Sequence, residues 1–549
     1  MKDQFCGFFT TAIVMCLSTL AQAQQGHVFT RDDTLRGSIT DGRIWWDLAY
    51  YELSLRVDPE KQYIKGSTTI HYDILSEYQV MQIDLQEPME FTSAVQDEKD
   101  LEVERAGKNA YFVHLEKPQQ KGSSESVVIS FEGKPITPAR PPWDGGIQWQ
   151  KDKLGYDFIA TSCQGLGASA WWACKDHMYD EPDSMLISIT IPSHLVDISN
   201  GRLRRAADNG NGTTTYDWFV GNPISNYVVN MNIGNYAHFS DTLQGEKGIL
   251  DLDYFVLVYN LPKAKEHFQQ VKPMLRAFEH WFGPYPFYED GYKLVEVPYL
   301  GMEHQSSVTY GNEFMNGYLG YDLSQTGWGL KWDYIIVHES GHEWFANNIT
   351  YKDIADMWIH EGFTYYSECL YVEYLYGKEA GAEYIIGSRH SIANESPIIG
   401  MYDVNREGSG DMYNKGGNLL HMIRQIFDDD RKWRETLRGL NRDFYHSIVT
   451  TKQIEDYISE RSGMHLEKVF DQYLRDTRIP VLEYKQDGNT LSYRWTNCID
   501  GFDMPMKVQT RDGEFEFIFP STTWESKRMR TDSEPVFDGN FYVDLRAVD

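Results

Sequence analysis

The feature that most restricts how this chain can fold is an apolar segment, residues 335–345, that carries His338, Glu339 and His342. In an α-helix, residues four positions apart lie on one face, so both imidazoles can point toward one metal ion. Bulky apolar side chains surround the three polar residues, and burying two histidines and a glutamate is costly unless they are paired or coordinated. The segment therefore predicts an internal metal site, with Glu339 placed to take a proton from water. A solvated polar helix face is the alternative.

A site of this kind needs a third ligand, and Glu361 is the best candidate. Zinc suits the histidine pair, because catalytic zinc sites use three protein ligands and leave a fourth position for water. Eighteen residues separate His342 from Glu361, which is room for the helix to end and a second helix to return alongside. Glu368 follows two helical turns later and could accept an N–H from a ligand imidazole, although a solvated position is equally compatible with its sequence. We expect one Zn²⁺ per chain.

The surrounding residues resemble the zinc aminopeptidases of the aminopeptidase N and leukotriene-hydrolysing enzyme family, which are gluzincins with an HExxH–x18–E spacing. Residues 344–350 resemble the family's W-F-G-N-x-V-T, with Ala346 in place of glycine. Residues 358–363 resemble W-L-N-E-G-F, with His360 in place of asparagine. The resemblance covers roughly residues 45–480. The family's large helical carboxy-terminal domain does not fit the 69 residues that follow Pro480.

The resemblance implies an amine-binding segment upstream of the metal pattern. Gly301, Met302, Glu303 and His304 resemble the exopeptidase motif G-x-M-E-N, in which the glutamate binds the free amino group of the substrate. On its own, Glu303 would be interpreted as an edge-strand carboxylate. His304 departs from the family's asparagine: as a cation it would repel the incoming ammonium, whereas as a neutral ring it could donate a hydrogen bond.

Two further roles rest on the resemblance. Tyr413, in the sequence Y-N-K-G, matches the family's tyrosine that stabilises the transition state. Gln164 lies in a segment similar to the leukotriene-hydrolysing branch, where a glutamine is the second amine anchor. Taken alone, Tyr413 would be a packing residue and Gln164 a turn amide.

The spacing of apolar residues changes twice along the chain, which predicts a multidomain α+β fold. Alternation over residues 51–57 and 186–191, with β-rich runs at 80–85, 127–131 and 250–259, predicts a β-sheet domain over 24–260. Three- and four-residue spacing predicts a helical domain over 261–479, with a helix at 268–282 that kinks at Pro273. The resemblance implies that this is the zinc peptidase domain. Alternation then returns and predicts a small β-sandwich over 480–549. The resemblance implies that the first domain is saddle-like and the second a thermolysin-like α/β domain.

Charge and the amino-terminal segment restrict partners and location. With 51 basic and 81 acidic residues, the net charge of −30 excludes nucleic-acid binding through a basic surface. Residues 1–23 combine one lysine, an apolar run and a small-residue end at Ala21-Gln22-Ala23, which is typical of a cleaved signal peptide. We therefore expect export to the periplasm or the extracellular space, without stable membrane insertion afterwards. A membrane anchor or a short buried helix is the alternative interpretation.

Cysteine content does not support a disulfide scaffold. After cleavage of the signal peptide, four cysteines would remain, Cys163, Cys174, Cys369 and Cys498, and one bridge among them is possible in an oxidising compartment.

The leading functional hypothesis is hydrolysis of the amino-terminal residue from peptides with a free amino group. In it Glu339 is the general base, Tyr413 donates to the oxyanion, and Glu303 and Gln164 hold the amine. One alternative keeps the metal but makes the enzyme a zinc endopeptidase or a lipid-epoxide hydrolase. Another is a metal-binding homologue that has lost catalysis. Hydrolysis of free against amino-blocked peptides, an epoxide assay, and metal content with turnover discriminate among these hypotheses.

Overall fold

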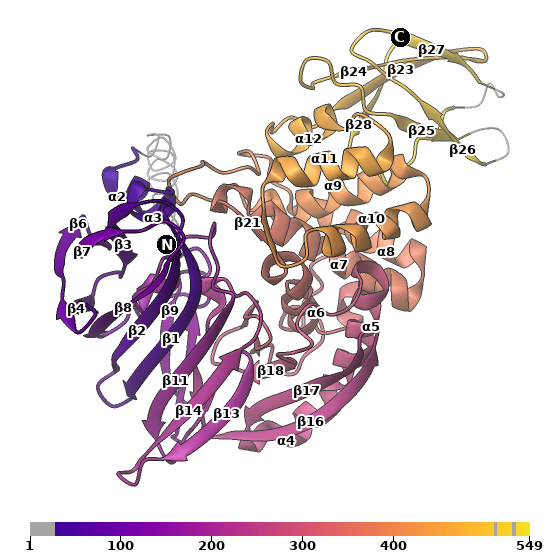
Figure 1. Ribbon diagram of the computed structural model, residues 1–549. Coiled ribbons are helices and arrows are strands. Elements are labelled where there is room, and N and C mark those ends of the chain that lie inside the picture. The colour runs from indigo at the N-terminus through magenta and orange to yellow at the C-terminus, as the bar shows by residue number, and fades with distance from the viewer. Residues whose placement is uncertain (1–27, 510–512, 530–533) are drawn as a thin grey trace, which may run out of the picture.

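The computed structural model describes residues 28–509, 513–529 and 534–549, so the predicted signal peptide lies outside the described residues. Along the chain, two short helices lead into a part made mostly of strands, a mostly helical part follows, and strands return at the carboxy-terminal end (Figure 1). The α+β fold predicted from the two changes in periodicity is confirmed. The exact domain boundaries remain a prediction.

The amino-terminal part is built on an eight-stranded sheet. Its central strand β1, Trp46–Asp58, alternates buried and accessible residues over most of its length, because one face of the sheet covers the core. In sheet order the strands are β13 (Arg202–Asp208), β14 (Thr213–Val220), β11 (Ser184–Pro192), β1, β2 (Tyr63–Ile74), β8 (Ser124–Gly133), β4 (Met89–Gln96) and β5 (Lys99–Asp100).

Two smaller sheets complete this part of the molecule. One has the order β12 (Val196–Ile198), β15 (Asn232–Gly234), β10 (Asp157–Ser162) and β9 (Gly146–Lys151). The other has the order β3 (Tyr78–Asp84), β7 (Ala110–Gln119) and β6 (Glu102–Ala106). The helices α2 (Arg31–Gly37) and α3 (Asp41–Ile44) precede β1. The runs predicted as strands at 80–85, 127–131 and 186–191 coincide closely with β3, β8 and β11.

A five-stranded sheet leads into the helical part and carries one strand of the site. Its order is β16 (Tyr236–Gly245), β17 (Gly248–Leu257), β18 (Tyr292–Glu296), β20 (Val308–Tyr310) and β19 (Gly301–Met302). The short strand β19 therefore lies at an edge of this sheet, where one side of its backbone is available for pairing.

Helices α4 and α5 follow β17. Helix α4 spans Leu261–His267, and α5 spans Val271–Phe282 and ends at Gly283. Pro273 lies in the first turn of α5, where its missing N–H is not needed. The preceding residues Phe268–Gln270 form a separate 3₁₀ turn. The prediction of one continuous helix over 268–282 with a kink at Pro273 is therefore wrong.

The longest helix of the following part is α7, Trp358–Tyr376, whose first fifteen residues are buried. Helices α6, α8 and α9 contact α7, which makes it the centre of this part. The other helices of this region are α6 (Tyr334–Gly341), α8 (Lys378–Gly387), α9 (Asp411–Phe427), α10 (Asp430–Asp443), α11 (Thr451–Ser462) and α12 (Glu467–Leu474). A two-stranded parallel pair, β21 (Ile349–Tyr351) and β22 (Ser447–Val449), lies among them.

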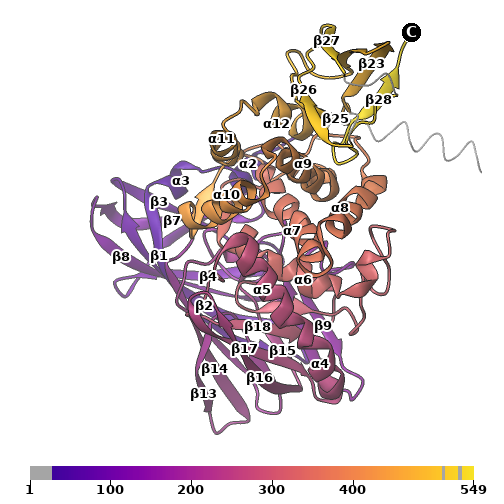
Figure 2. The same cartoon turned by 90° about the vertical axis from the view of Figure 1, so that its right-hand side faces the viewer.

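The carboxy-terminal strands form two small sheets next to α9 and α12 (Figure 2). The four-stranded sheet has the order β27 (Glu525–Arg528), β24 (Thr490–Thr496), β23 (Val481–Asp487) and β28 (Asp544–Ala547). The second pairs β25 (Met506–Gln509) with β26 (Phe515–Ile518). Their buried side chains belong to the same apolar core as those of the helices, so these strands pack on the helical part.

Two predictions from the sequence concern membranes and cysteines. Within the described ranges, no helix combines the length and the apolar character that crossing a membrane requires. The four cysteines of the described chain, Cys163, Cys174, Cys369 and Cys498, carry free thiols.

Candidate metal centre and active site

The two histidines are carried by α6, a short helix that is buried along its whole length. Asp333 caps the helix by accepting a hydrogen bond from the N–H of Ile336 at 3.2 Å, which satisfies one of the free donors of the first turn. His338 lies inside α6, and His342 is the next residue after its end. The buried apolar helix with both rings on one face is the arrangement that the spacing predicts.

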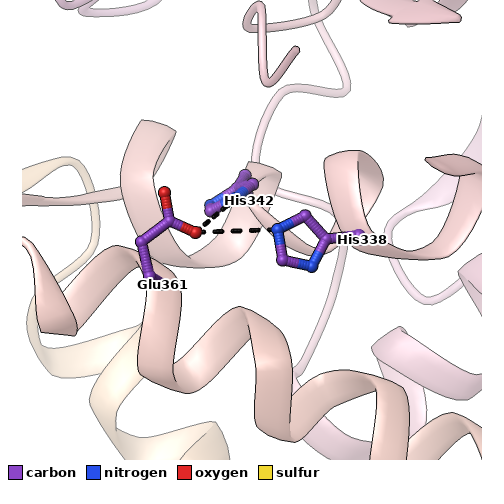
Figure 3. Close-up of side chains that lie close together, drawn as sticks. All are labelled: His338, His342 and Glu361. Atoms are coloured by element: carbon purple, nitrogen blue, oxygen red, sulfur yellow. Dashed lines mark ion pairs between the residues drawn. The ribbon is translucent and has the colours of Figure 1, made fainter. Parts of the chain in front are cut away.

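Glu361 reaches the same point from the first turn of α7, and Figure 3 shows its carboxylate facing both rings. Glu361 Oε2 lies 3.6 Å from His338 Nε2 and 3.4 Å from His342 Nε2. One candidate ligand atom from each residue lies within 4.8 Å of the others, and all three residues are buried. The structure therefore brings together the three residues that the sequence predicts as metal ligands.

Each imidazole is oriented by a hydrogen bond from its other nitrogen. His338 Nδ1 donates to Glu368 Oε1 at 2.7 Å, and the Tyr384 hydroxyl donates to the second oxygen of Glu368 at 2.5 Å. His342 Nδ1 donates to the carbonyl of Phe345 at 3.0 Å. A proton on Nδ1 leaves the lone pair of Nε2 free for a metal ion. Glu368 thus lies where its helical spacing predicts, beside a ligand imidazole, whereas Tyr384 was not identified from the sequence.

The residues at this point fit a zinc ion. In the described part of the chain nothing donates a hydrogen bond to Glu361 Oε2, although the atom is buried, and a buried carboxylate oxygen of this kind calls for a cation. Two atoms bound about 2.1 Å from a tetrahedral zinc ion lie about 3.4 Å apart, close to the separations observed here. Burial alone would raise the pKa of Glu361, but His342 and His338 hold it well below its ordinary value, so the carboxylate stays charged.

The turn that follows His342 departs from regular helix. Residues Glu343–Asn347 form a π-helical turn in which Phe345 and Ala346 are not helical. Phe345 is extended, with φ −128° and ψ 88°, and its carbonyl accepts the hydrogen bond from His342. Ala346 has φ 150° and ψ −56°, a conformation that glycine adopts far more readily than alanine. Ala346 stands where the motif that this segment resembles has glycine, so strain lies next to Phe345, the residue whose carbonyl orients His342.

Replacing Ala346 by glycine should therefore stabilise the protein by about 1 kcal/mol. Relief of about 1–3 kcal/mol of strain outweighs the added freedom of the unfolded chain, about 0.5–1 kcal/mol. Thermal unfolding of the zinc-loaded protein should show a rise in Tm of about 1 °C. The control is Ala277→Gly, because Ala277 is a buried residue inside α5, and this variant should lower Tm. A lower Tm for Ala346→Gly would contradict the strain at this position.

Glu339 lies beside the two histidines on α6 and close to β19. Burial raises the pKa of Glu339 to about 7, with His338 acting in the opposite direction. A carboxylate with a pKa near 7 can accept a proton and return it near neutral pH. A side-chain carbon at Gly301 would lie 3.1 Å from Glu339 Cγ and 2.5 Å from Ile335 Cγ2. Glycine at 301 therefore lets β19 pass directly beside the candidate base.

Tyr413 enters the site from the first turn of α9. Its ring lies over that of His338, with centres 6.1 Å apart and planes inclined by 25°. Burial and the nearby Glu361 carboxylate raise the pKa of Tyr413 well above its ordinary value. The hydroxyl therefore remains protonated and can donate a hydrogen bond, as its predicted role requires.

Glu303 follows β19 directly and is held by groups from three other segments. Its Oε1 accepts hydrogen bonds from Gln164 Nε2 at 2.8 Å and from the Tyr227 hydroxyl at 3.0 Å. Its backbone carbonyl accepts one from Asn347 Nδ2 at 3.0 Å. The amide of Gln164 also donates to Glu361 Oε1 at 2.6 Å. Gln164 therefore links the candidate amine anchor to a candidate metal ligand.

Sequence reasoning missed Tyr227 and Asn347. Tyr227 lies in a 3₁₀ turn, Asn226–Val228, and no local pattern distinguishes it from the other tyrosines. Asn347 belongs to the segment 344–350 that resembles the family motif, so that resemblance could have identified it.

The structure does not give His304 a place at the amine site. Its ring is fully buried, with Nδ1 2.9 Å from the Val228 carbonyl and Nε2 3.1 Å from the Thr161 carbonyl. Burial lowers the pKa of His304 to about 4, so the ring is neutral near pH 7. Both nitrogens face backbone groups, so the ring neither repels an ammonium nor offers a donor to one. The expectation that His304 contacts substrate is corrected accordingly.

Two other residues of the motifs, Met302 and His360, do not face the metal position. Met302 is buried in β19, with 2% of its surface exposed. His360 precedes Glu361, but its Nε2 accepts the backbone N–H of Tyr351 at 3.1 Å. The ring of His360 therefore binds the backbone of β21. This agrees with the expectation that the residue next to Glu361 in sequence points in a different direction from Glu361.

Comparison with known proteins identifies two family domains in the chain. The model of the peptidase family M1 domain matches residues 266–473, and that of the peptidase M1 N-terminal domain matches residues 48–228. Together these matches cover most of the chain. They include every metal-ligand and catalytic residue predicted from the sequence.

Relatives of known name are similar over the same region. A leucyl aminopeptidase of Saccharolobus solfataricus is 22% identical over 388 residues, which are 68% of this chain and 47% of that protein. A puromycin-sensitive aminopeptidase of Caenorhabditis elegans is 23% identical over 364 residues, 62% of this chain and 37% of that protein. The chain thus spans half or less of the length of these relatives.

A solved structure shares the fold. An M1 zinc metallopeptidase variant from Deinococcus radiodurans, bound to a Tyr-Ser-Ala substrate, matches with a TM-score of 0.68 and 19% identity. The match covers 81% of this chain and 98% of that one. With the His338, His342 and Glu361 cluster and both family domains in place, this chain belongs to peptidase family M1.

Proposed function

We propose that this protein is a zinc-dependent aminopeptidase, which hydrolyses the peptide bond after the amino-terminal residue of its substrate. The observation that carries the proposal is the position of the Gln164 amide, which donates to both Glu303 Oε1 and Glu361 Oε1. A carboxylate that can bind an ammonium thus lies one side chain away from the metal ligands. When Glu303 binds the amine of the substrate, the first peptide bond is the one held at the metal position, so that one residue is released.

The amine site leaves one carboxylate oxygen for the substrate. Oε1 of Glu303 already accepts hydrogen bonds from Gln164 and Tyr227, so Oε2 is the oxygen available to an ammonium. Glu303 is only 2% exposed, and attraction between opposite charges is stronger there than in water. Burial raises the pKa of Glu303, and a bound ammonium would favour its charged form.

The chemistry is divided between the metal and three side chains. Zinc bound by His338, His342 and Glu361 would polarise the scissile carbonyl and make water acidic enough to deprotonate near neutral pH. Glu339 takes the proton and delivers it to the leaving amine. Tyr413 donates a hydrogen bond to the oxyanion, an effect typically worth about 3 kcal/mol in comparable sites.

The edge strand β19 explains how a peptide lies across these groups. A peptide backbone can pair along the free edge of β19, with its amine at Glu303 and its chain running past Met302 and Gly301. An endopeptidase must accept chain on both sides of the cleaved bond. Here the buried carboxylate of Glu303, with Gln164 and Tyr227 behind it, occupies the amine side. This arrangement favours an aminopeptidase over the endopeptidase alternative.

Similar proteins support the same substrate class. The relatives described above are named as aminopeptidases, and the structural neighbour from Deinococcus radiodurans holds a tripeptide substrate. Peptides with a free amino terminus are therefore the proposed substrates of this chain.

Replacing Glu303 by alanine should lower kcat/KM about 100-fold for alanine 4-nitroanilide, because truncating one partner of a buried charge pair costs about 2–5 kcal/mol. Residual hydrolysis of the acetylated substrate should change less than about threefold, since that substrate presents no ammonium. The control is Glu379→Ala, an exposed carboxylate on α8, which should leave both activities unchanged. An equal loss on free and acetylated substrates would argue against an amine anchor and against the proposed function.

We also propose that the chain is exported to the periplasm or the extracellular space. The proposal rests on residues 1–23, whose apolar run and small-residue end are typical of a signal peptide. Cell fractionation with amino-terminal sequencing should find the mature chain outside the cytoplasm, beginning near residue 24. Cytoplasmic protein with an intact amino terminus would contradict export.

A further inference from the structure

A cavity of about 750 Å³ opens beside the segment that leads into β19. Residues 297–300 form one wall, and Trp143 and Tyr259 contribute aromatic surface. Its volume lies within the range of about 300–1,000 Å³ that is usual for small-molecule sites. The metal ligands, Glu303 and Gln164 do not line it, so it is separate from the centre described above.

The direction of the bound peptide leads into this cavity. The amine end lies at Glu303, and the candidate base Glu339 lies beside Gly301, two residues earlier along the chain. A peptide that pairs antiparallel with β19 advances one residue for each residue of the strand. The Glu303 side chain binds the amine of the first residue, and the bond that follows this residue lies beside Gly301 and Glu339. In this register the second residue lies opposite Gly301, the third opposite Leu300 and the fourth opposite Tyr299, and Leu300 and Tyr299 both line the cavity.

Two lysines line the cavity from separate elements. Lys153 follows β9, and its Nζ lies 3.5 Å from the centre of the Tyr259 ring. Lys263 lies in α4. Neither lysine makes an ion pair with a carboxylate anywhere in the described ranges of the chain. In a protein of net charge −30, two cations without ion pairs at one cavity provide a local site for an anion.

Two acidic residues, Glu296 and Glu313, also line the cavity, and neither forms an ion pair with Lys153 or Lys263. The oxygens of Glu296 accept hydrogen bonds from the Leu257 N–H at 2.8 Å and from the Asn260 amide at 2.6 Å. Burial raises the pKa of Glu296, while Lys153 and Lys263 both act to lower it, which places both ammonium groups near this carboxylate. Glu313 is exposed at the cavity. The lysines thus retain donors for a further acceptor.

We propose that Lys153 and Lys263 bind a carboxylate on the third or fourth residue of the peptide substrate. The carboxylate is either the carboxy terminus of a tri- or tetrapeptide or an acidic side chain at that position. The inference rests on the proposed aminopeptidase function and adds a preference for short or acidic peptides. The aromatic surface of Trp143 and Tyr259 would contact the apolar part of the same residues.

The test compares the double variant Lys153→Gln/Lys263→Gln with the control Lys151→Gln/Lys265→Gln. The control removes the same charge from β9 and α4, but Lys151 pairs with Asp157 and neither control lysine lines the cavity. The substrates are Ala-Ala-Ala, Ala-Ala-Ala-amide, Ala-Ala-Asp-amide and alanine 4-nitroanilide, which is too short to reach the lysines. In the wild type, kcat/KM should be about tenfold higher for Ala-Ala-Ala than for its amide. The ratio should fall below about twofold in the double variant and stay unchanged in the control, with the nitroanilide unaffected in both.

The outcomes distinguish a free carboxy terminus from an acidic side chain as the source of the carboxylate. They also distinguish failure of the lysine inference from failure of the proposed aminopeptidase function. If the wild type hydrolyses Ala-Ala-Asp-amide as fast as Ala-Ala-Ala, an acidic side chain is sufficient to bind the lysines. If it hydrolyses Ala-Ala-Asp-amide as slowly as Ala-Ala-Ala-amide, the free carboxy terminus is the ligand. Equal rates for Ala-Ala-Ala and its amide in the wild type overturn the inference, as does an equal loss in the control variant. Aminopeptidase activity on the nitroanilide would persist in both of those cases. Absence of turnover on every substrate would instead overturn the proposed function itself.

Discussion

Replacing Glu339 by glutamine should leave one zinc ion bound per chain and lower kcat about 10³-fold. The amide keeps nearly the shape of the carboxylate but cannot accept a proton, and a positioned general base contributes about 10²–10⁴-fold to the rate. Glu339 is not one of the three residues that form the ligand cluster, so zinc content and KM should stay close to those of the wild type. Metal analysis and steady-state hydrolysis of alanine 4-nitroanilide measure the two quantities.

Glu343 provides a matched control, because it is also buried and lies one turn further along the chain. Its Oε1 accepts the backbone N–H of Ser306 at 2.8 Å, and burial raises its pKa to about 8. Below that pH the side chain is neutral, so Glu343→Gln changes neither charge nor shape and should keep kcat within about threefold. Normal turnover of the Glu339→Gln protein would exclude Glu339 as the base.

Removing the carboxylate of Glu361 should abolish both stoichiometric zinc binding and turnover. Glu361→Ala leaves two histidines as the protein ligands, whereas zinc sites of this kind use three. Partners that only orient a ligand are typically worth about 10–100-fold in metal affinity, so loss of a direct ligand should have a larger effect. Competition with a chelator of known affinity measures the change in zinc binding.

Glu368 provides a graded comparison at the same site. It holds His338 Nδ1 but faces away from the metal position, so Glu368→Gln should weaken zinc binding about 10–100-fold and still yield active enzyme at saturating zinc. Wild-type zinc affinity in the Glu361→Ala protein would contradict the ligand assignment. Circular dichroism of both variants establishes that the fold is retained.

The parts of the site that follow from helical geometry could be predicted residue by residue. His338 and His342 are one turn apart, and Glu368 lies two turns after Glu361 on α7, where it meets the ring of His338. The strands β1 and β11 follow from alternation in the same way, since one face of the sheet is buried. Pro273 shows the limit of such reasoning, because its effect depends on where the helix begins.

Family resemblance extended the prediction beyond local geometry but misplaced one residue. Glu303 and Gln164 meet as the motifs imply, although 139 positions separate them along the chain. His304 occupies the position of a family asparagine, yet its ring turns to the carbonyls of Val228 and Thr161. A motif specifies the backbone position of a residue, whereas the direction of its side chain depends on which neighbours can satisfy its polar atoms.

Local periodicity was sufficient for the metal-binding helix, the alternating strands and the spacing of the ligands, because dihedral angles and repeat lengths act between neighbours along the chain. The amine pocket depended on the packed molecule. Gln164, Tyr227, Glu303 and Glu361 come from distant segments, and Gln164 and Glu361 alone are 197 positions apart. They meet because the amino-terminal sheets pack against the helices around α7. That packing comes from the burial of apolar surface over the whole fold, which no short stretch of residues encodes.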